Sequence, residues 1–326
     1  MRTLLSYLHK NQFVAALFII VLGLFFIRIK EILIILFISY IVMTAFRPAV
    51  LFLNKKKLPY VLSVLVPYII FCIFLIILIL PLFPFFAAQI QSLANNFPVF
   101  LEKSSQAVGF KIDYSNVDSS INSFFRTVGG NLFSITGQVF GGIISVTTII
   151  VVSFYLLLYH DRFEKLIVHL FPQDKEEQAR ETFLKIEEKL GKWLRGQLVL
   201  SLLIGVLSWI FLTLIGIEYA LPLAFIAGLL EIIPMIGPVI AAVPAIIVAL
   251  TISPGLAVTV IIGYIVIQTI ESNIFVPKIM QSAVGLNPVI IITAILVGSN
   301  FLGVWGALLS VPFVSVITII LSEFKD

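Results

Sequence analysis

Two carboxylic acids in this sequence occupy positions where a charge is expensive. Of the seventeen acidic residues, only Glu231 and Glu271 lie within apolar segments and away from the obvious ends of those segments. A carboxylate at membrane depth is costly, and by default it indicates a functional site. Glu231 directly precedes a Pro-Gly break, where it is suited to accept a proton or to receive hydrogen bonds from the free N–H groups of the next half-helix. A structural role, in which Glu231 holds the broken backbone, fits the sequence equally well.

Several amides accompany these acids. Gln268 lies one turn before Glu271 and shares its helical face, although a snorkelling, interfacial role suits Glu271 at least as well. Asn273 and Asn300 stand at breaks or ends, where an amide can bind a polar, uncharged, sugar-like ligand without burying a charge. The alternative for such residues is helix capping, which we favour for Asn287.

Prolines and glycines form the third set of candidate residues. Breaks of this kind free carbonyl and N–H groups that can coordinate a small solute or an ion. Glycines spaced by three or four residues equally well allow helices to pack closely. The candidates for the pathway are Pro234, Gly237, Pro238, Gly303 and Gly306.

Composition defines the class of protein. Hydrophobic residues make up 60% of the chain and charged residues 12%, and the mean hydropathy is +1.14, well outside the range of soluble proteins. Runs of eighteen or more nearly uncharged residues recur, and strand alternation is absent from them. The sequence therefore predicts an all-α polytopic membrane protein.

Some functions are disfavoured by what the sequence lacks. No G-x-x-x-x-G-K-[ST] motif is present, so an ATP-driven motor is not expected. His9, His160 and His169 fall outside the predicted spans, which disfavours an intramembrane protease or a histidine-bound metal. Cys72 is the single cysteine, so no disulfide framework exists. We expect no enzyme activity, cofactor or metal, and the net charge of +4 does not indicate nucleic-acid binding.

Two long apolar stretches, 221–251 and 286–321, position most of these residues. Each is too long for one simple span, and each half is too short: twelve residues from Pro222 make roughly 18 Å of helix, against ~30 Å of hydrocarbon. We expect two re-entrant hairpins whose breaks are buried in protein or line water. A kinked, tilted full span is the alternative. The residues predicted to shape these breaks are Pro222, Pro244, Pro277, Pro288 and Pro312.

About six full spans complete the prediction. They cover residues 11–27, 32–52, 60–82, 143–159, 198–217 and 256–276. A tight polar turn is predicted at residues 28–31, amphipathic helices at 85–108 and 117–138, and a solvent-facing amphipathic helix at 174–195. The predicted parts are a three-helix membrane segment (1–82), an extracytoplasmic insertion (83–142), a span with a charged cytoplasmic helix (143–196), and a transport core (197–326).

Charge predicts the orientation. With a cytoplasmic N-terminus and two hairpins, sixteen basic residues lie in the cytoplasm and five outside, as the positive-inside rule prefers. Both termini are then cytoplasmic, and the two hairpin units insert in opposite orientations. Such an inverted repeat suits alternating access, so we expect the tips 231–238 and 298–306 to face one another.

The second half of the chain resembles a known family. Glu231-Ile-Ile-Pro234-x-x-Gly237-Pro238 and the later pattern from Glu271 through Pro288 to Pro312 are similar to the signature of the autoinducer-2 exporter family. The resemblance implies a bacterial inner-membrane transporter, homo-oligomeric assembly, and either export of the furanone autoinducer-2, a quorum-sensing signal, or sodium (lithium)/proton antiport.

Three functional hypotheses follow. The first is a secondary exporter of a small polar metabolite, with autoinducer-2 as the best candidate. The second is a Na⁺(Li⁺)/H⁺ antiporter that uses Glu231 as the exchanging carboxylate. The third is a membrane scaffold without transport, for which the charged helix at 160–196 would be essential and Pro234 and Gly237 would not.

Overall fold

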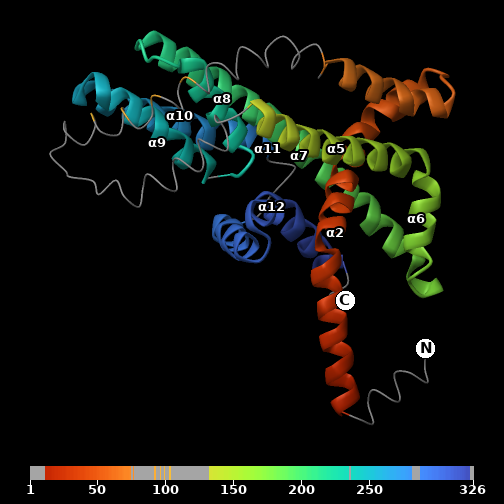
Figure 1. Ribbon diagram of the computed structural model, residues 1–326. Coiled ribbons are helices and arrows are strands. Elements are labelled where there is room, and N and C mark those ends of the chain that lie inside the picture. Colours follow the sequence, from red (N-terminus) through yellow and green to blue (C-terminus); the bar gives the residue numbers. More distant parts are fainter. Residues whose placement is uncertain are drawn as a thin grey trace.

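The fold is an assembly of helices, as the sequence predicts. The computed structural model describes residues 12–74, 132–280 except 235, and 287–323, with five isolated positions between 76 and 103, and its regular elements there are all helical (Figure 1). Four helices in these ranges are long and apolar enough to cross a membrane, or five if a pair bent by 76° after Leu158 is one span. The chain is therefore a multi-pass membrane protein, while its division at residues 82, 142 and 196 stays a prediction.

The first helix corrects the predicted turn at residues 28–31. Helix α2 runs without a break from Gln12 to Lys55, a length of roughly 66 Å at 1.5 Å per residue. Arg28, Lys30 and Glu31 are residue types that favour helices, and no proline or glycine accompanies them. A single helix that crosses a membrane has its two ends on opposite sides of that membrane, whereas two spans joined by a turn would return to one side. A cytoplasmic N-terminus therefore no longer follows from the charge pattern.

Helix α7 corrects a second boundary. The predicted surface helix at 174–195 and the predicted span at 198–217 are one helix, Glu176–Leu214, preceded by α5 (Leu132–Leu158), α6 (His160–Val168) and the short helix η1 (Gln173–Lys175). Phe183, Leu190 and Trp193 are buried, which confirms the inner face predicted for its polar half. Most of the predicted insertion lies outside the described residues.

A buried ionic cluster joins the polar part of α7 to its neighbours. Glu187, whose side chain is 1% exposed, forms an ion pair with Arg47 of α2 and accepts a hydrogen bond from His160 Nε2 at 2.9 Å. Glu164 of α6 accepts a hydrogen bond from Arg180 Nε at 2.8 Å. These contacts pair the buried charges with one another, as burial requires.

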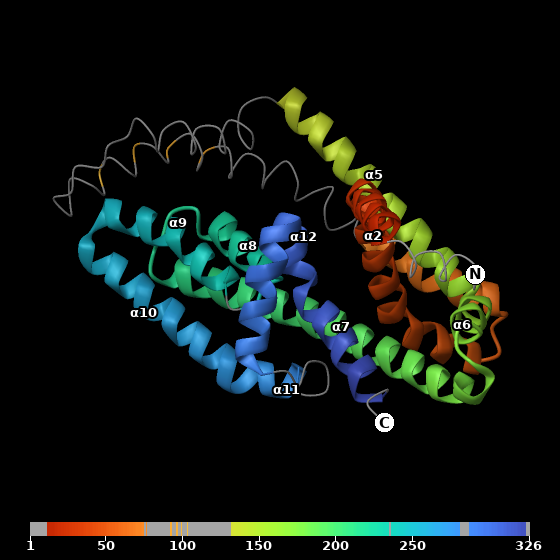
Figure 2. The same ribbon diagram turned by 90° about the horizontal axis from the view of Figure 1, so that it is seen from below.

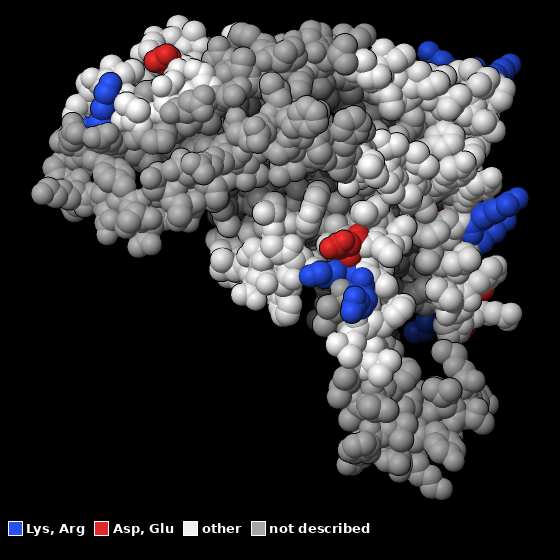
Figure 3. Space-filling view, in the orientation of Figure 1, with Lys and Arg blue, Asp and Glu red and all other residues white. Residues whose placement is uncertain are grey.

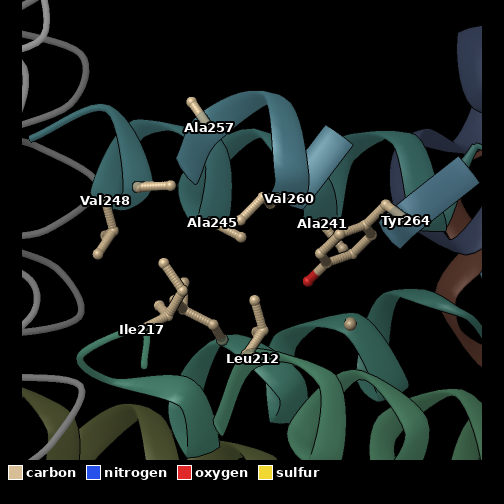
Figure 4. Close-up of a cluster of buried hydrophobic side chains, with 11 residues drawn as sticks. Leu212, Ile217, Ala241, Ala245, Val248, Ala257, Val260 and Tyr264 are labelled. Atoms are coloured by element: carbon tan, nitrogen blue, oxygen red, sulfur yellow. The ribbon is translucent and has the colours of Figure 1, made fainter. Parts of the chain in front are cut away.

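The first broken stretch is a helical hairpin. Helix α8 (Ala220–Leu230) and helix α9 (Gly237–Ile252) pack against each other, and each is too short to cross a membrane. Helix α10 (Pro254–Ile270) returns along α9. Small and branched side chains from α7, α8, α9 and α10 form the apolar cluster shown in Figure 4, including Leu212, Ala241, Ala245, Val248 and Val260.

The second broken stretch also folds back on itself. Helix α12 (Pro288–Glu323) bends at Gly303, whose φ is 60°. The Ser310 hydroxyl donates a hydrogen bond of 2.8 Å to the carbonyl of Ala294. In a straight helix these residues would be separated by roughly 24 Å. The two halves of α12 therefore lie side by side, as Figure 2 shows, and the alternative of a kinked full span is wrong here.

Two of the prolines predicted to break helices do not do so: Pro244 lies inside α9 and Pro312 inside α12. Pro277 stands in the first turn of the short helix α11 (Val276–Met280), directly after an irregular turn. Pro222 and Pro288 stand in the first turns of α8 and α12, where the missing N–H costs nothing.

The surface fits a lipid environment. Side chains such as Leu202 (69% exposed) and Leu214 (80% exposed) point away from the protein. Among the described residues in Figure 3 most of the visible surface is uncharged, and charged side chains lie over the middle of α2, along the right-hand edge and at the upper left. The apolar outer face and the charged edge together are typical of a protein embedded in a bilayer.

The α12 hairpin makes a testable prediction. In a Cys72→Ser background, Ala294→Cys combined with Ser310→Cys should form a disulfide under mild oxidation, because the hydrogen bond holds these positions together. Mobility on a non-reducing gel after cleavage between the two sites measures the link. Ala294→Cys combined with Leu321→Cys is the matched control and should stay unlinked. Equal cross-linking in both pairs would contradict the hairpin.

Candidate functional site

The structure brings the two predicted carboxylic acids together. Glu231 ends helix α8 and is 1% exposed, and Glu271 follows the last residue of α10 and is 5% exposed. Their carboxyl groups lie close enough to interact electrostatically. The Gln268 amide donates a hydrogen bond of 3.1 Å to Glu271 Oε2. The shared face predicted for Gln268 and Glu271 is confirmed, and Glu271 is not a snorkelling surface residue.

A local change of helix type positions Glu271. Residues Glu271–Phe275 form a π-helix, labelled η2, in which the Val276 N–H donates to the Glu271 carbonyl. Pro277 follows, and because proline lacks an N–H and clashes with the preceding turn, an ordinary α-turn is disfavoured there. Wider turns of this kind occur often at functional sites. Here the π-turn directs Glu271 toward the end of α8.

The hairpin turn depends on a third residue that the sequence analysis did not select. The Gln197 side chain of α7 is buried, and its amide donates a hydrogen bond of 2.5 Å to the Glu231 backbone carbonyl. This carbonyl belongs to the end of α8, where no helical N–H remains to satisfy it. In the sequence, the only sign of this role is that Gln197 is a single amide on the buried face of an apolar helix.

Gly237 and Pro238 have structural reasons for their positions. A Cβ at Gly237 would lie 1.9 Å from the Leu230 carbonyl oxygen, so no side chain fits where α9 begins against the end of α8. Pro238 occupies the first turn of α9, and Pro234 lies in the connecting turn. Close backbone approach, which was one of the two alternatives for the glycines, is what the structure shows for Gly237.

The remaining predicted residues lie elsewhere. Asn273 is exposed and donates to the Thr269 carbonyl, while Asn300 is exposed on α12. Asn287 accepts a hydrogen bond from the Val289 N–H and caps α12, as predicted. Gly303 provides the bend of α12, and Gly306 packs against Gly298, with no space for a Cβ.

The two hairpin tips do not meet in this structure. The end of the α12 hairpin contributes Leu302 and Trp305 to a cavity of about 290 Å³ that is otherwise lined by α2 and α5. Within the described ranges, no hydrogen bond or ion pair joins the α12 bend to the turn at 231–236. The candidate site therefore lies where Glu231 meets helices α7 and α10, and not between the two hairpin tips as predicted.

The chemistry of this site follows from its charges. Two neighbouring carboxylates removed from water repel one another, and a shared proton or a cation between them relieves this repulsion. In the described part of the chain no Lys, Arg or His forms an ion pair with either group. The pair is therefore suited to hold a proton, or to exchange that proton for a small monovalent cation.

Comparison with known proteins identifies relatives along most of the chain. A family profile described as "AI-2E family transporter" matches residues 14–326. The chain is 29% identical over 313 residues to "Putative transport protein YrrI" of Bacillus subtilis, covering 92% of this chain and 88% of the relative. It is 29% identical over 137 residues to "AI-2 transport protein TqsA" of Escherichia coli, covering 42% of this chain and 40% of the relative.

The close approach at Gly237 predicts a loss of stability on substitution. Gly237→Ala should lower the melting temperature of the purified protein in detergent by several degrees, because its methyl group would overlap the Leu230 carbonyl and the fixed backbone cannot move away. Gly255→Ala, in the first turn of α10, is the control, since the nearest atom would be 4.0 Å from the new methyl group. Equal melting temperatures for the two variants would show that the backbone of the turn moves to accommodate the methyl group, which contradicts the prediction.

Proposed function

Because this chain belongs to the AI-2E family of transporters, we propose that it is a secondary transporter that moves a small polar solute by alternating access, coupled to protons at the Glu231–Glu271 pair. One observation supports this proposal above all others: two buried carboxyl groups lie close together, and no basic side chain in the described residues forms an ion pair with them. A structural role alone would be served at lower cost by neutral side chains.

The position of the pair supports a transport cycle. Glu231 lies at the end of a helix that is too short to cross the membrane, and Glu271 lies on a π-turn, so the pair is held by two irregular backbone segments. Irregular backbone at membrane depth is typical of binding sites in secondary transporters. Gain or loss of the shared proton changes the charge between α8 and α10, and this change provides the driving force for rearrangement.

Autoinducer-2 is the substrate that we propose to test first. The support is the relative TqsA, whose printed name is "AI-2 transport protein", together with the family signature in the second half of the chain. The site provides amide and carboxyl groups, which suit hydroxyl-rich, uncharged solutes. We further propose export across a bacterial inner membrane, with the charged 160–196 region in the cytoplasm, and assembly as a homo-oligomer.

A Na⁺(Li⁺)/H⁺ antiporter is the second candidate. The proximity of the Glu231 and Glu271 carboxyl groups favours it, because two carboxylates offer the oxygen ligands that small hard cations prefer. In this case the cation replaces the proton directly, and no organic solute is required. A scaffold without transport, the third hypothesis, receives no support from the membership in a transporter family.

The carboxyl pair predicts the result of a flux measurement. In proteoliposomes that contain a pH-sensitive dye, addition of autoinducer-2 should move protons through the wild-type protein. Glu231→Gln should reduce this proton movement to the level of empty vesicles, because the amide keeps the shape of the side chain and removes its titratable proton. Glu218→Gln is the matched control, since Glu218 is an exposed acid between α7 and α8.

The same vesicles separate the candidates. Proton movement that is driven by a Li⁺ or Na⁺ gradient without any organic solute identifies the antiporter. Solute uptake and proton movement that both persist in Glu231→Gln would remove this residue from the coupling role and leave it a structural one.

A further inference from the structure

Five polar side-chain atoms within the described residues are buried and have no hydrogen-bond partner there. They are Trp193 Nε1, Ser201 Oγ, Ser208 Oγ, Glu231 Oε2 and Tyr264 OH. Native proteins rarely leave such groups unpaired, and each of them therefore needs an explanation. Their arrangement provides one, because all five lie on or beside a single face of α7.

Three of these residues follow one stripe along α7. At 3.6 residues per turn, Trp193, Ser201 and Ser208 fall within about 80° of one another around the helix, and Gln197 lies inside the same arc. From Trp193 to Ser208 the stripe is roughly 22 Å long, which is most of the ~30 Å hydrocarbon thickness. A polar stripe of this length on a buried face is not required by packing.

Helix α10 presents a matching face. Gly263 packs against the ring of Phe211, and Gly196 packs against Met280 of α11, so that α7 runs antiparallel to α10 and α11. In this register the Tyr264 hydroxyl points toward α7, as Figure 4 shows, and lies beside the Ser208 hydroxyl. At this level the polar groups of the two helices therefore face one another.

The carboxyl pair lies along this line. Gln197, which belongs to the α7 stripe, binds the Glu231 carbonyl, and Glu271 lies in η2, about two turns beyond Tyr264 of α10. Hydroxyl groups both donate and accept hydrogen bonds, and waters that bridge them form continuous chains. Serine and tyrosine hydroxyls on either side of a proton-binding pair are the groups that a proton path requires.

We propose that a water-lined proton path follows the buried face of α7 beside Trp193 and leads past Glu231 and Glu271 to the Ser208 and Tyr264 hydroxyls, where α7 meets α10. This inference rests on the proposed function for its purpose, but its site is defined independently by the unpaired polar atoms. The path is occupied by water and protons, whose hydrogen bonds satisfy the five buried groups. It differs from the predicted pathway through the two hairpin tips.

The path is tested by thiol accessibility in the full-length protein. In a Cys72→Ser background, Ser201→Cys and Ser208→Cys change a hydroxyl to a thiol of similar size. Both should react with a small, charged, water-soluble methanethiosulfonate in membrane vesicles, as measured by a mass shift. Glu218→Cys, on an exposed loop, is the positive control.

Two leucine positions provide negative controls. The native Leu212 side chain is 0% exposed and lies one turn beyond Ser208 in the apolar cluster, whereas Leu202 is 69% exposed on the outer face of the same helix. The variants Leu212→Cys and Leu202→Cys should both stay unmodified. If Ser201→Cys and Ser208→Cys are as unreactive as Leu212→Cys, the interface is dry and the proposed path is wrong.

Transport measurements keep the two proposals separate. Reactive serine positions in a protein that moves no solute or cation would support the path and contradict the transport function. Unreactive positions in a protein whose proton flux depends on Glu231 would support the function and contradict the path. Tyr264→Phe adds a third measurement: if the path is correct, proton movement slows while binding of the solute keeps its affinity.

Discussion

A helix that ends inside a bilayer leaves backbone carbonyls without water to satisfy them, and this constraint decides how the core is built. At the end of α8 the Gln197 side chain supplies the missing donor to Glu231. In α12 the Ser310 hydroxyl instead donates to the carbonyl of Ala294, inside the first half of the helix, and so joins the two halves on either side of the bend. In both hairpins, therefore, a hydrogen bond from a polar side chain of a neighbouring helical segment helps to hold the interrupted backbone in place. Glycines at the same places allow the backbones to approach closely enough for these bonds to form.

Helix α7 connects the parts of the molecule because it crosses all of them. Its polar half holds Glu187 between Arg47 and His160, and its apolar half packs on α8, α10 and the hairpin turn. Glu187 and Gln197 are ten residues apart on one unbroken helix, roughly 15 Å. A displacement of α7 at the ionic cluster would therefore be transmitted to the carbonyl that Gln197 binds. Glu187 of the charged cluster and Gln197, which binds the turn beside the carboxyl pair, are parts of one unbroken helix.

The sequence allowed some of this to be predicted and not the rest. The hairpins followed from length, because twelve apolar residues cannot cross the hydrocarbon, and Glu231 and Glu271 followed from the rarity of acids in such segments. The turn at residues 28–31 was wrong because charge was taken as a sign of a turn, whereas Arg28 and Glu31 continue a helix readily. Polar residues show where a chain meets water or a partner. A helix is broken only by glycine, by proline or by a side chain that competes for its backbone hydrogen bonds.

The hydropathy and spacing of the sequence could not predict contacts between distant segments of the chain. Nothing in the spacing of Glu231 and Glu271 says that the chain between them returns to the same point, because that depends on how α8 and α10 pack against α7. The expectation that the two hairpin tips meet came from symmetry, which describes topology and does not determine packing. Glu231 at the end of α8 instead lies near Glu271, which begins the π-turn that precedes Pro277. Since the pair stays buried only when a proton or cation reduces its charge, the packing of this core and the occupancy of its site are linked, and a change in one requires a change in the other.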